Sequence, residues 1–200
     1  QNLLRNINSY VSLPRRKSGI YKNFKKKKLK KIVFNVQNNI WDMASNGIHY
    51  LDLVSWLSNK KIKNIDVSGL EDWYPSKRKG YYDVNGKLIF YFNKNFSAHL
   101  ISKENIKKPK LELITKNNKW ELREYETILV KNNKNIYKIK KGYSSISKIM
   151  KTEIKNILEN KKINLPRFKD IYYNHCAYIK ALLLHWNKYH KKNTKILPIT

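Results

Sequence analysis

The sequence predicts an α+β domain in which a mostly antiparallel, open, meandering β-sheet carries helices on one face. Short segments with alternating apolar residues follow one another closely between residues 81 and 140, and strands joined by such short connections pair antiparallel. Helical patterns fill residues 38–59, 143–160 and 166–189. With 200 residues, of which 41% are hydrophobic, the chain has the size of one globular domain.

The first forty residues predict a helix and a strand. Residues 3–13 read as a short helix end and a strand, and Pro14 then suits the start of a helix. Residues 21–31 complete an amphipathic and very basic helix. Residues 31–36 alternate as a strand, with Ile32, Phe34 and Val36 on one face.

Residues 38–59 predict the central helix, which is buried on most of its circumference. Apolar or small residues recur at steps of three and four in two sets. The sets are Met43, Gly47, Tyr50, Val54, Leu57 and Ala44, Ile48, Leu51, Ser55. The remaining face collects Asp42, Ser45, Asn46, His49 and Asp52. Such a polar stripe is costly unless it meets partners or a cleft.

Three residues of this helix have specific expected roles. Asp42 is the expected N-cap. Gly47 costs about 1 kcal/mol relative to alanine in a helix interior, so we expect another group to approach the backbone there. His49 has two interpretations: a core histidine hydrogen-bonded to Asp52, or an imidazole that exchanges a proton in a cleft.

A long β region follows the central helix. Residues 62–67 alternate as a strand, and residues 71–79, which include Pro75, are expected to form a loop. Asn85-Gly86 separates residues 81–84 from residues 87–92, which is a strong hairpin signal. Further strands are expected at residues 96–102, 110–115, 120–125, 128–130 and 136–140. His99 is expected to be an ordinary sheet residue.

The last third predicts two helices without a metal site. Ile146, Ile149, Met150, Ile154, Ile157 and Leu158 form a stripe on the first helix. His175, His185 and His190 lie on the second, but no carboxylate or cysteine pattern accompanies them, so no metal is expected. The single cysteine, Cys176, excludes an internal disulfide and is expected to be a reduced core thiol.

The charge allows two interpretations. Lysine and arginine number 43 against 14 acidic residues, giving a formal net charge of +29. A basic nucleic-acid-binding protein is one possibility. We favour the biased composition of an A/T-rich genome, because the lysines are scattered through every segment and few arginines accompany them. No apolar run is long enough to span a bilayer, so we expect no membrane partner and a cytoplasmic location.

Three stretches together resemble the Gfo/Idh/MocA oxidoreductases. SNGIHYLDLVSWL at residues 45–57 is similar to the family's D-x-G-x-H-x-x-D-L helix. SYVSLPRRK at residues 9–17 is similar to the family's strand-to-helix joint, in which an aliphatic run is followed by N-R-R. LPRFKDIYYNHCAYIKALLLHW at residues 165–186 is similar to the family's terminal L-P-x-x-x-x-A-x-x-x-H helix, and the final LPIT resembles members attached to surface-sugar pathways. Order and spacing agree over nearly the whole chain.

The resemblance implies the C-terminal half of a two-domain enzyme. Residues 1–13 would close an N-terminal Rossmann-type domain, and residues 14–200 would form the substrate-binding and oligomerisation domain. The sequence contains neither G-x-G-x-x-G nor E-K-P, so NAD or NADP is expected to be bound by a domain outside this chain. The implied activity is hydride transfer at a hydroxyl-bearing carbon of a sugar or sugar derivative, and we expect a homo-oligomer formed through the sheet.

The resemblance also assigns roles to the polar stripe. His49 would be the catalytic acid/base, Ser45 and Asn46 would line the substrate pocket, and Asp52 would orient His49. Arg15 and Arg16 are either solvated helix charges or substrate ligands. Ser45 stands where the family has an aspartate, which leaves open a non-catalytic or truncated family member.

Overall fold

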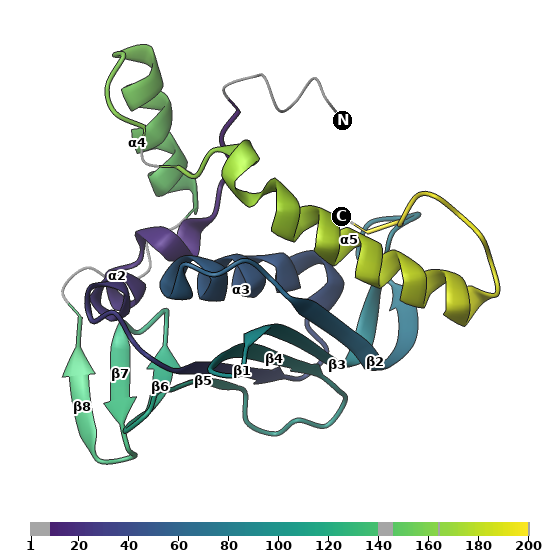
Figure 1. Ribbon diagram of the computed structural model, residues 1–200, viewed down its shortest axis with the longest axis horizontal. Coiled ribbons are helices and arrows are strands. Elements are labelled where there is room, and N and C mark those ends of the chain that lie inside the picture. The colour runs from purple at the N-terminus through teal and green to yellow at the C-terminus, as the bar shows by residue number, and fades with distance from the viewer. Residues whose placement is uncertain (1–8, 140–145, 164, 200) are drawn as a thin grey trace.

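The computed structural model describes residues 9–139, 146–163 and 165–199, and it confirms the α+β prediction with one open sheet carrying helices on one face (Figure 1). The elements are η1 (Pro14–Lys17), α2 (Gly19–Lys26), β1 (Ile32–Asn38), α3 (Met43–Ser58), β2 (Asn64–Pro75), β3 (Tyr82–Asn93), β4 (Phe96–Ser102), β5 (Lys110–Ile114), β6 (Lys119–Arg123), β7 (Ile128–Lys131), β8 (Asn135–Lys138), α4 (Ile146–Leu158) and α5 (Phe168–His190). The expectations for residues 3–8 and 143–145 lie outside the described residues.

The eight strands follow the order β2-β3-β4-β1-β5-β6-β7-β8. Every neighbouring pair is antiparallel except β1 and β4, which are parallel. The mostly antiparallel sheet is therefore confirmed, but the meander is interrupted because β1 enters between β4 and β5. Residues 103–109 connect these two strands, which lie on opposite sides of β1.

The predicted hairpin at Asn85-Gly86 is wrong, because both residues lie within β3. The predicted loop at residues 71–79 is wrong for residues 71–75, which belong to β2, whereas residues 76–79 do lie in the connection between β2 and β3. Gly86 has a φ of +105° and lies opposite Leu70, between two register shifts in the β2–β3 ladder. A Cβ at Gly86 would collide with the carbonyl oxygen of Gly69. This glycine therefore permits a β-bulge rather than a turn.

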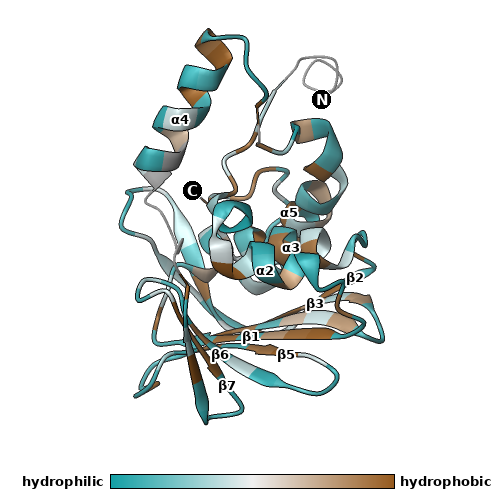
Figure 2. Ribbon diagram, turned by 90° about the vertical axis from the view of Figure 1, so that its left-hand side faces the viewer, coloured by the Kyte–Doolittle hydropathy of each residue, from teal (hydrophilic) through white to brown (hydrophobic). Residues whose placement is uncertain are grey.

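The helix layer covers the face of the sheet that carries Phe34, Phe90 and Leu100 (Figure 2). α3 packs on β4 and β3, while α5 packs on β2 and α3. The first predicted apolar set of α3 is buried as expected. None of the helices in the described residues has the length and apolar character to cross a bilayer.

α4 stands apart from the body of the domain (Figure 1). Glu153 anchors it through an ion pair with Lys17 of η1. Its predicted apolar stripe is partly exposed, because the side chains of Ile154, Ile157 and Leu158 are in contact with solvent.

The expected close approach to Gly47 is confirmed, and the approaching group is Tyr178 of α5. A Cβ at position 47 would lie 2.6 Å from the Tyr178 hydroxyl and 3.2 Å from Cδ1 of Leu100. The hydroxyl donates to the carbonyl oxygens of Ala44 at 2.7 Å and Met43 at 3.2 Å. The missing side chain therefore lets α5 contact the backbone of α3.

We expect Gly47→Ala to lower the free energy of unfolding by about 1–3 kcal/mol, because overpacking in the core exceeds the gain in helix propensity. Urea denaturation measures this change. Tyr178→Phe removes the atom nearest the added methyl group, so the double variant Gly47→Ala/Tyr178→Phe should lose less stability than the sum of the two single variants. Additive losses would show that the hydroxyl does not limit the packing.

Candidate functional site

The N-terminus of α3 is capped by Asp83 of β3 and not by the predicted Asp42. Asp83 is fully buried. Its carboxylate accepts hydrogen bonds from the amides of Ala44 at 2.6 Å and Ser45 at 3.2 Å, and from the Ser45 hydroxyl at 3.0 Å. The Asp42 side chain makes no capping hydrogen bond. Burial raises the pKa of Asp83, while these hydrogen bonds act in the opposite direction.

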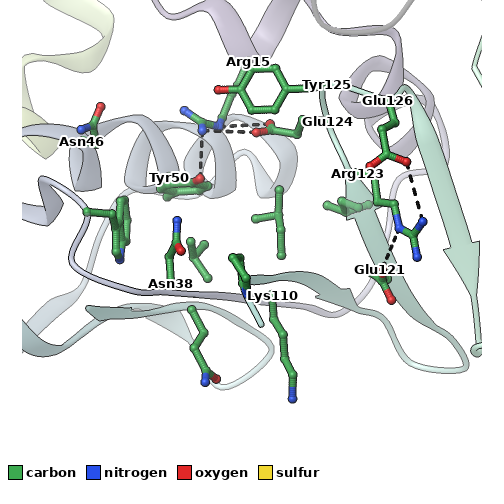
Figure 3. Close-up of a pocket in the computed structure, with 16 residues that line it drawn as sticks. Arg15, Asn38, Asn46, Tyr50, Lys110, Glu121, Arg123, Glu124, Tyr125 and Glu126 are labelled. Atoms are coloured by element: carbon green, nitrogen blue, oxygen red, sulfur yellow. Dashed lines mark hydrogen bonds and ion pairs between the residues drawn. The ribbon is translucent and has the colours of Figure 1, made fainter. Parts of the chain in front are cut away.

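A cavity of about 530 Å³ lies beside the N-terminal half of α3, where the end of β1 faces β5 and β6 (Figure 3). Its lining combines polar and apolar side chains from segments far apart in the chain. The labelled polar residues include Arg15, Asn38, Asn46, Tyr50, Lys110 and Glu124. Cavities of this size are typical of small-molecule sites.

Arg15 is fixed in the wall of this cavity and is not a solvated helix charge. Its guanidinium donates to the Tyr50 hydroxyl at 2.8 Å and to Glu124 at 3.3 Å, and it lies 4.1 Å from the centre of the Tyr50 ring. The Tyr21 hydroxyl donates to the same carboxylate at 2.6 Å. Burial raises the pKa of Tyr50 to about 12, so its hydroxyl remains a neutral hydrogen-bonding group.

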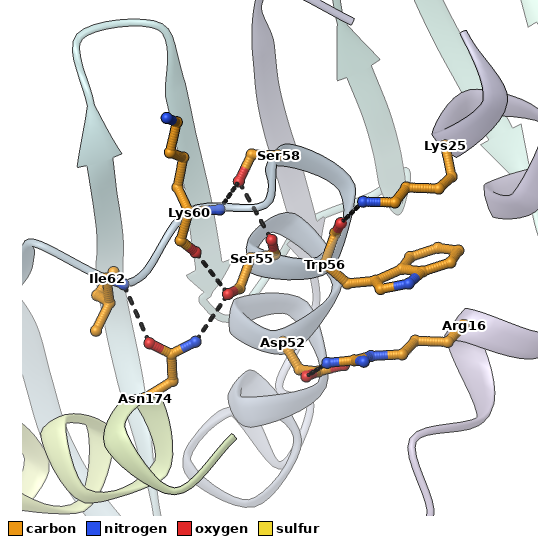
Figure 4. Close-up of polar contacts among 9 residues, drawn as sticks. All are labelled: Arg16, Lys25, Asp52, Ser55, Trp56, Ser58, Lys60, Ile62 and Asn174. Carbon is orange, nitrogen blue, oxygen red and sulfur yellow. Dashed lines mark hydrogen bonds and ion pairs between the residues drawn. The ribbon is translucent and has the colours of Figure 1, made fainter. Parts of the chain in front are cut away.

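Arg16 and Asp52 form a separate pair on another side of α3 (Figure 4). Nε of Arg16 donates to Asp52 at 2.8 Å, and Nη2 contacts the other carboxylate oxygen. Asp52 is only 2% exposed, and neither residue lines the cavity. Within the described residues no hydrogen bond joins Asp52 to His49, so the expected orienting contact is replaced by the pair with Arg16.

His49 is half-buried and lies outside the lining of the cavity. Its Nδ1 is buried and has no hydrogen-bond partner in the described part of the chain. Burial, together with the positive charges of Arg15 and His175, lowers the pKa of His49 to about 4. The imidazole is therefore neutral near pH 7, when it can accept a proton or a hydrogen bond.

Asn46 and Ser45 connect this site to a second, smaller cavity. Asn46 lines both spaces, while Ser45 lines only the second, which has a volume of about 370 Å³ and also contacts Lys77 and Arg78. The Asn46 amide donates to the carbonyl oxygen of Asp42 at 2.9 Å, which fixes the side chain at the start of α3.

The sequence predictions missed Glu124, Tyr50 and Asp83. Glu124 directly follows β6 and lies in the stretch 120–125 that the sequence predicts to be a strand. No local sequence pattern indicates its contact with Arg15. The helical periodicity places Tyr50 in the apolar set of α3 and gives no sign of its contact with Arg15. Asp83 carried a usable signal, since a carboxylate within the apolar run YYDV needs a partner when it is buried. Among the described residues, no group of three His, Cys, Asp or Glu side chains could hold a metal ion.

The chain resembles solved structures of oxidoreductases. A dehydrogenase (MviM) from Clostridium difficile is 19% identical, with a TM-score of 0.57 over 90% of this chain and 63% of that chain. UDP-N-acetylglucosamine 3-dehydrogenase GnnA from Acidithiobacillus ferrooxidans is 9% identical, with a TM-score of 0.56 over 86% and 58%. Myo-inositol dehydrogenase from Lactobacillus casei, in complex with NAD(H) and myo-inositol, is 16% identical, with a TM-score of 0.50 over 94% and 63%.

These matches establish a shared fold over most of this chain, which spans just under two thirds of the length of the three structures. No protein-family model matches the sequence, and no curated protein matches it. The fold implied by the resemblance to the Gfo/Idh/MocA oxidoreductases is therefore confirmed.

The lowered pKa of His49 predicts a pH-dependent stability. Unfolded chains bind a proton at this histidine below pH 6.5, whereas the folded chain does so only near pH 4. The free energy of unfolding should therefore be highest above pH 6.5 and fall as the pH drops toward 4. We expect His49→Asn to reduce this slope in urea denaturation series. An unchanged slope would contradict the assignment of the lowered pKa to His49.

Proposed function

We propose that this chain is the substrate-binding half of an NAD(P)-dependent oxidoreductase that acts on a hydroxyl group of a sugar or sugar derivative. The observation that carries the proposal is the cavity beside the N-terminal half of α3, in a fold shared with known dehydrogenases. Two of the matched structures are named for a UDP-sugar and for myo-inositol. A place in surface-polysaccharide synthesis is part of the proposal.

The cavity has the chemistry that a polyhydroxylated substrate requires. Sugar hydroxyls donate and accept hydrogen bonds, and the amides of Asn38 and Asn46 can serve both roles. Arg15 adds donors, and Glu124 adds acceptor oxygens already held by Tyr21 and Arg15. Ser45 reaches the adjoining space. Arg16 is a less suitable substrate ligand, since it is paired with Asp52 away from the cavity.

His49 is the proposed acid/base. Its imidazole is neutral at physiological pH, so one ring nitrogen can accept a proton. Because Nδ1 is buried and His49 lies outside the lining of the cavity, the proposal requires the substrate hydroxyl to reach the other ring nitrogen, Nε2. The chain contains no glycine-rich pyrophosphate turn, and we therefore expect the dinucleotide to be held by a Rossmann-type domain outside these residues. When bound, a nicotinamide cofactor supplies the hydride acceptor.

We expect His49→Asn to lower turnover by about 10²- to 10⁴-fold, the range typical of losing a general acid/base. The assay requires the protein together with its nucleotide-binding domain, and the melting temperature of each variant should be measured in parallel. His99→Asn is the matched control, because His99 is also half-buried and lies in β4, outside both cavities near α3.

The alternative is a non-catalytic member of the same fold. A His49→Asn variant that is destabilised but keeps full turnover per folded molecule would remove His49 from the mechanism. A coding sequence that lacks a nucleotide-binding domain would favour the truncated alternative for the whole protein.

We also propose that the chain forms a homo-oligomer through the face of the sheet that the helices leave uncovered (Figure 2). Leu88, Phe90 and Phe92 are buried on the helix-covered face. The alternating positions Ile89 and Tyr91 pair with His99 and Ser97 on the opposite face. Tyr91 is 36% exposed whereas Ile89 is 7% exposed, so Tyr91 is the side chain that we propose to contact a second copy.

Light scattering after size-exclusion chromatography should give a mass greater than that of one chain. Tyr91→Lys should shift the protein toward the monomer, because it places a cation in the proposed interface. Tyr173→Lys is the control, since Tyr173 is an exposed tyrosine of α5 in the helix layer. A wild-type protein that remains monomeric at high concentration would contradict the proposed assembly.

A further inference from the structure

A second well-formed cavity lies between α2 and the outer strands of the sheet. It has a volume of about 540 Å³ and is lined by residues from α2, β6, β7, β8 and the adjoining turns. None of these residues lines the candidate site beside α3. We call it the α2–β8 cavity. Its volume falls within the usual range for pockets that bind small organic molecules.

Aromatic rings form the wall of the α2–β8 cavity. Trp120 of β6 lies between Phe24 and Tyr137, with ring centres 5.4 Å and 5.8 Å apart. Trp120 is buried, whereas Tyr137 is 42% exposed. Leu129 and Ile139 complete the apolar part of the lining. A flat ring can therefore stack on Tyr137 beside the edge of Trp120.

Three lysines give this cavity a positive charge, and no acidic side chain lines the cavity to neutralise it. Lys26, Lys27 and Lys131 line it, together with the amides of Asn23 and Asn118, and its lining contains no carboxylate. Nζ of Lys27 lies 5.2 Å from the centre of the Trp120 ring, and Nζ of Lys131 lies 5.8 Å from the same ring. Within the described residues, none of the three lysines has an ion-pair partner.

Several basic side chains at the cavities beside α3 also have no ion-pair partner among the described residues, namely Lys110, Lys77 and Arg78, whereas the two arginines of the main cavity are paired. Beside α3, Arg15 pairs with Glu124 and Arg123 pairs with Glu121. Lys27 is also the C-cap residue of α2, where a cation is favoured by the helix dipole. That effect accounts for Lys27 and for Lys26 in the last turn of α2. It does not account for Lys131, which belongs to β7 and approaches the same indole ring from the sheet.

We propose that the α2–β8 cavity binds a planar organic anion, and specifically a nucleoside phosphate. The base stacks on Tyr137 against the aromatic wall, and the phosphate oxygens accept hydrogen bonds from the ammonium groups of Lys27 and Lys131. Asn23 and Asn118 provide amide groups beside the base. This site is independent of the function proposed for the cavity beside α3.

Calorimetric titration of the 200-residue chain with UDP, uridine and pyrophosphate tests the proposal. UDP should bind more tightly than either fragment, because only UDP uses both the aromatic wall and the lysines. The UDP affinity should fall as the salt concentration rises. Lys27→Gln/Lys131→Gln should weaken UDP binding about tenfold through the loss of two charge-assisted contacts. Tyr137→Ala should weaken UDP binding and leave pyrophosphate binding unchanged.

Lys22→Gln/Lys30→Gln is the matched control, since it removes the same charge from exposed lysines outside the cavity and should leave the UDP affinity unchanged. Equal loss of affinity in both double variants would overturn the proposal in favour of general attraction to a basic surface. Pyrophosphate binding as tight as UDP binding would show that the aromatic rings do not contribute, and would overturn the proposal. Absence of UDP binding at low salt would also overturn the proposal.

Discussion

The carboxylate of Asp83 connects the sheet to the start of α3, and the position of the candidate site depends on this contact. The first amides of a helix have no partner within the helix, and each buried amide left without a hydrogen bond costs about 1–3 kcal/mol. Asp83 of β3 accepts from two of these amides and from the Ser45 hydroxyl. Tyr178 donates to two carbonyl oxygens of the same turn from α5. The turn that carries Ser45 and Asn46 is thus held from two sides.

Much of the fold could be predicted because its signals are local. The two apolar sets of α3 repeat over several turns, and the strands after Phe96 alternate clearly. The strand order could not be predicted, since β1 pairs with two strands that come much later in the chain. Asn85-Gly86 was misleading because a glycine with positive φ suits both a hairpin turn and a β-bulge. The close contact between Gly86 and Gly69 favours the bulge. The local sequence around Gly86 does not indicate this contact, because Gly69 belongs to the neighbouring strand.

The candidate site could be predicted only in part. Asn46 and Arg15 line the main cavity, and Ser45 lines the adjoining one. Glu124 escaped detection because 109 positions separate it from Arg15. The spacing of His49 and Asp52 is that of neighbours on a helix, but Arg16 engages both oxygens of Asp52. A buried carboxylate is stabilised far more by a bidentate guanidinium than by a neutral imidazole, so Asp52 pairs with Arg16.

Chemical-shift mapping of the isotopically labelled chain with neutral sugars and polyols, including myo-inositol, tests most directly whether the cavity beside α3 is a substrate site. Ligands should be added to about 10 mM, above the usual enzyme KM range of about 1 μM to 1 mM. We expect saturable shifts of the side-chain amides of Asn38 and Asn46 and of the backbone around Tyr50. Shifts confined to other surfaces, or no saturable shift with any member of the panel, would contradict the assignment of a sugar substrate to this cavity.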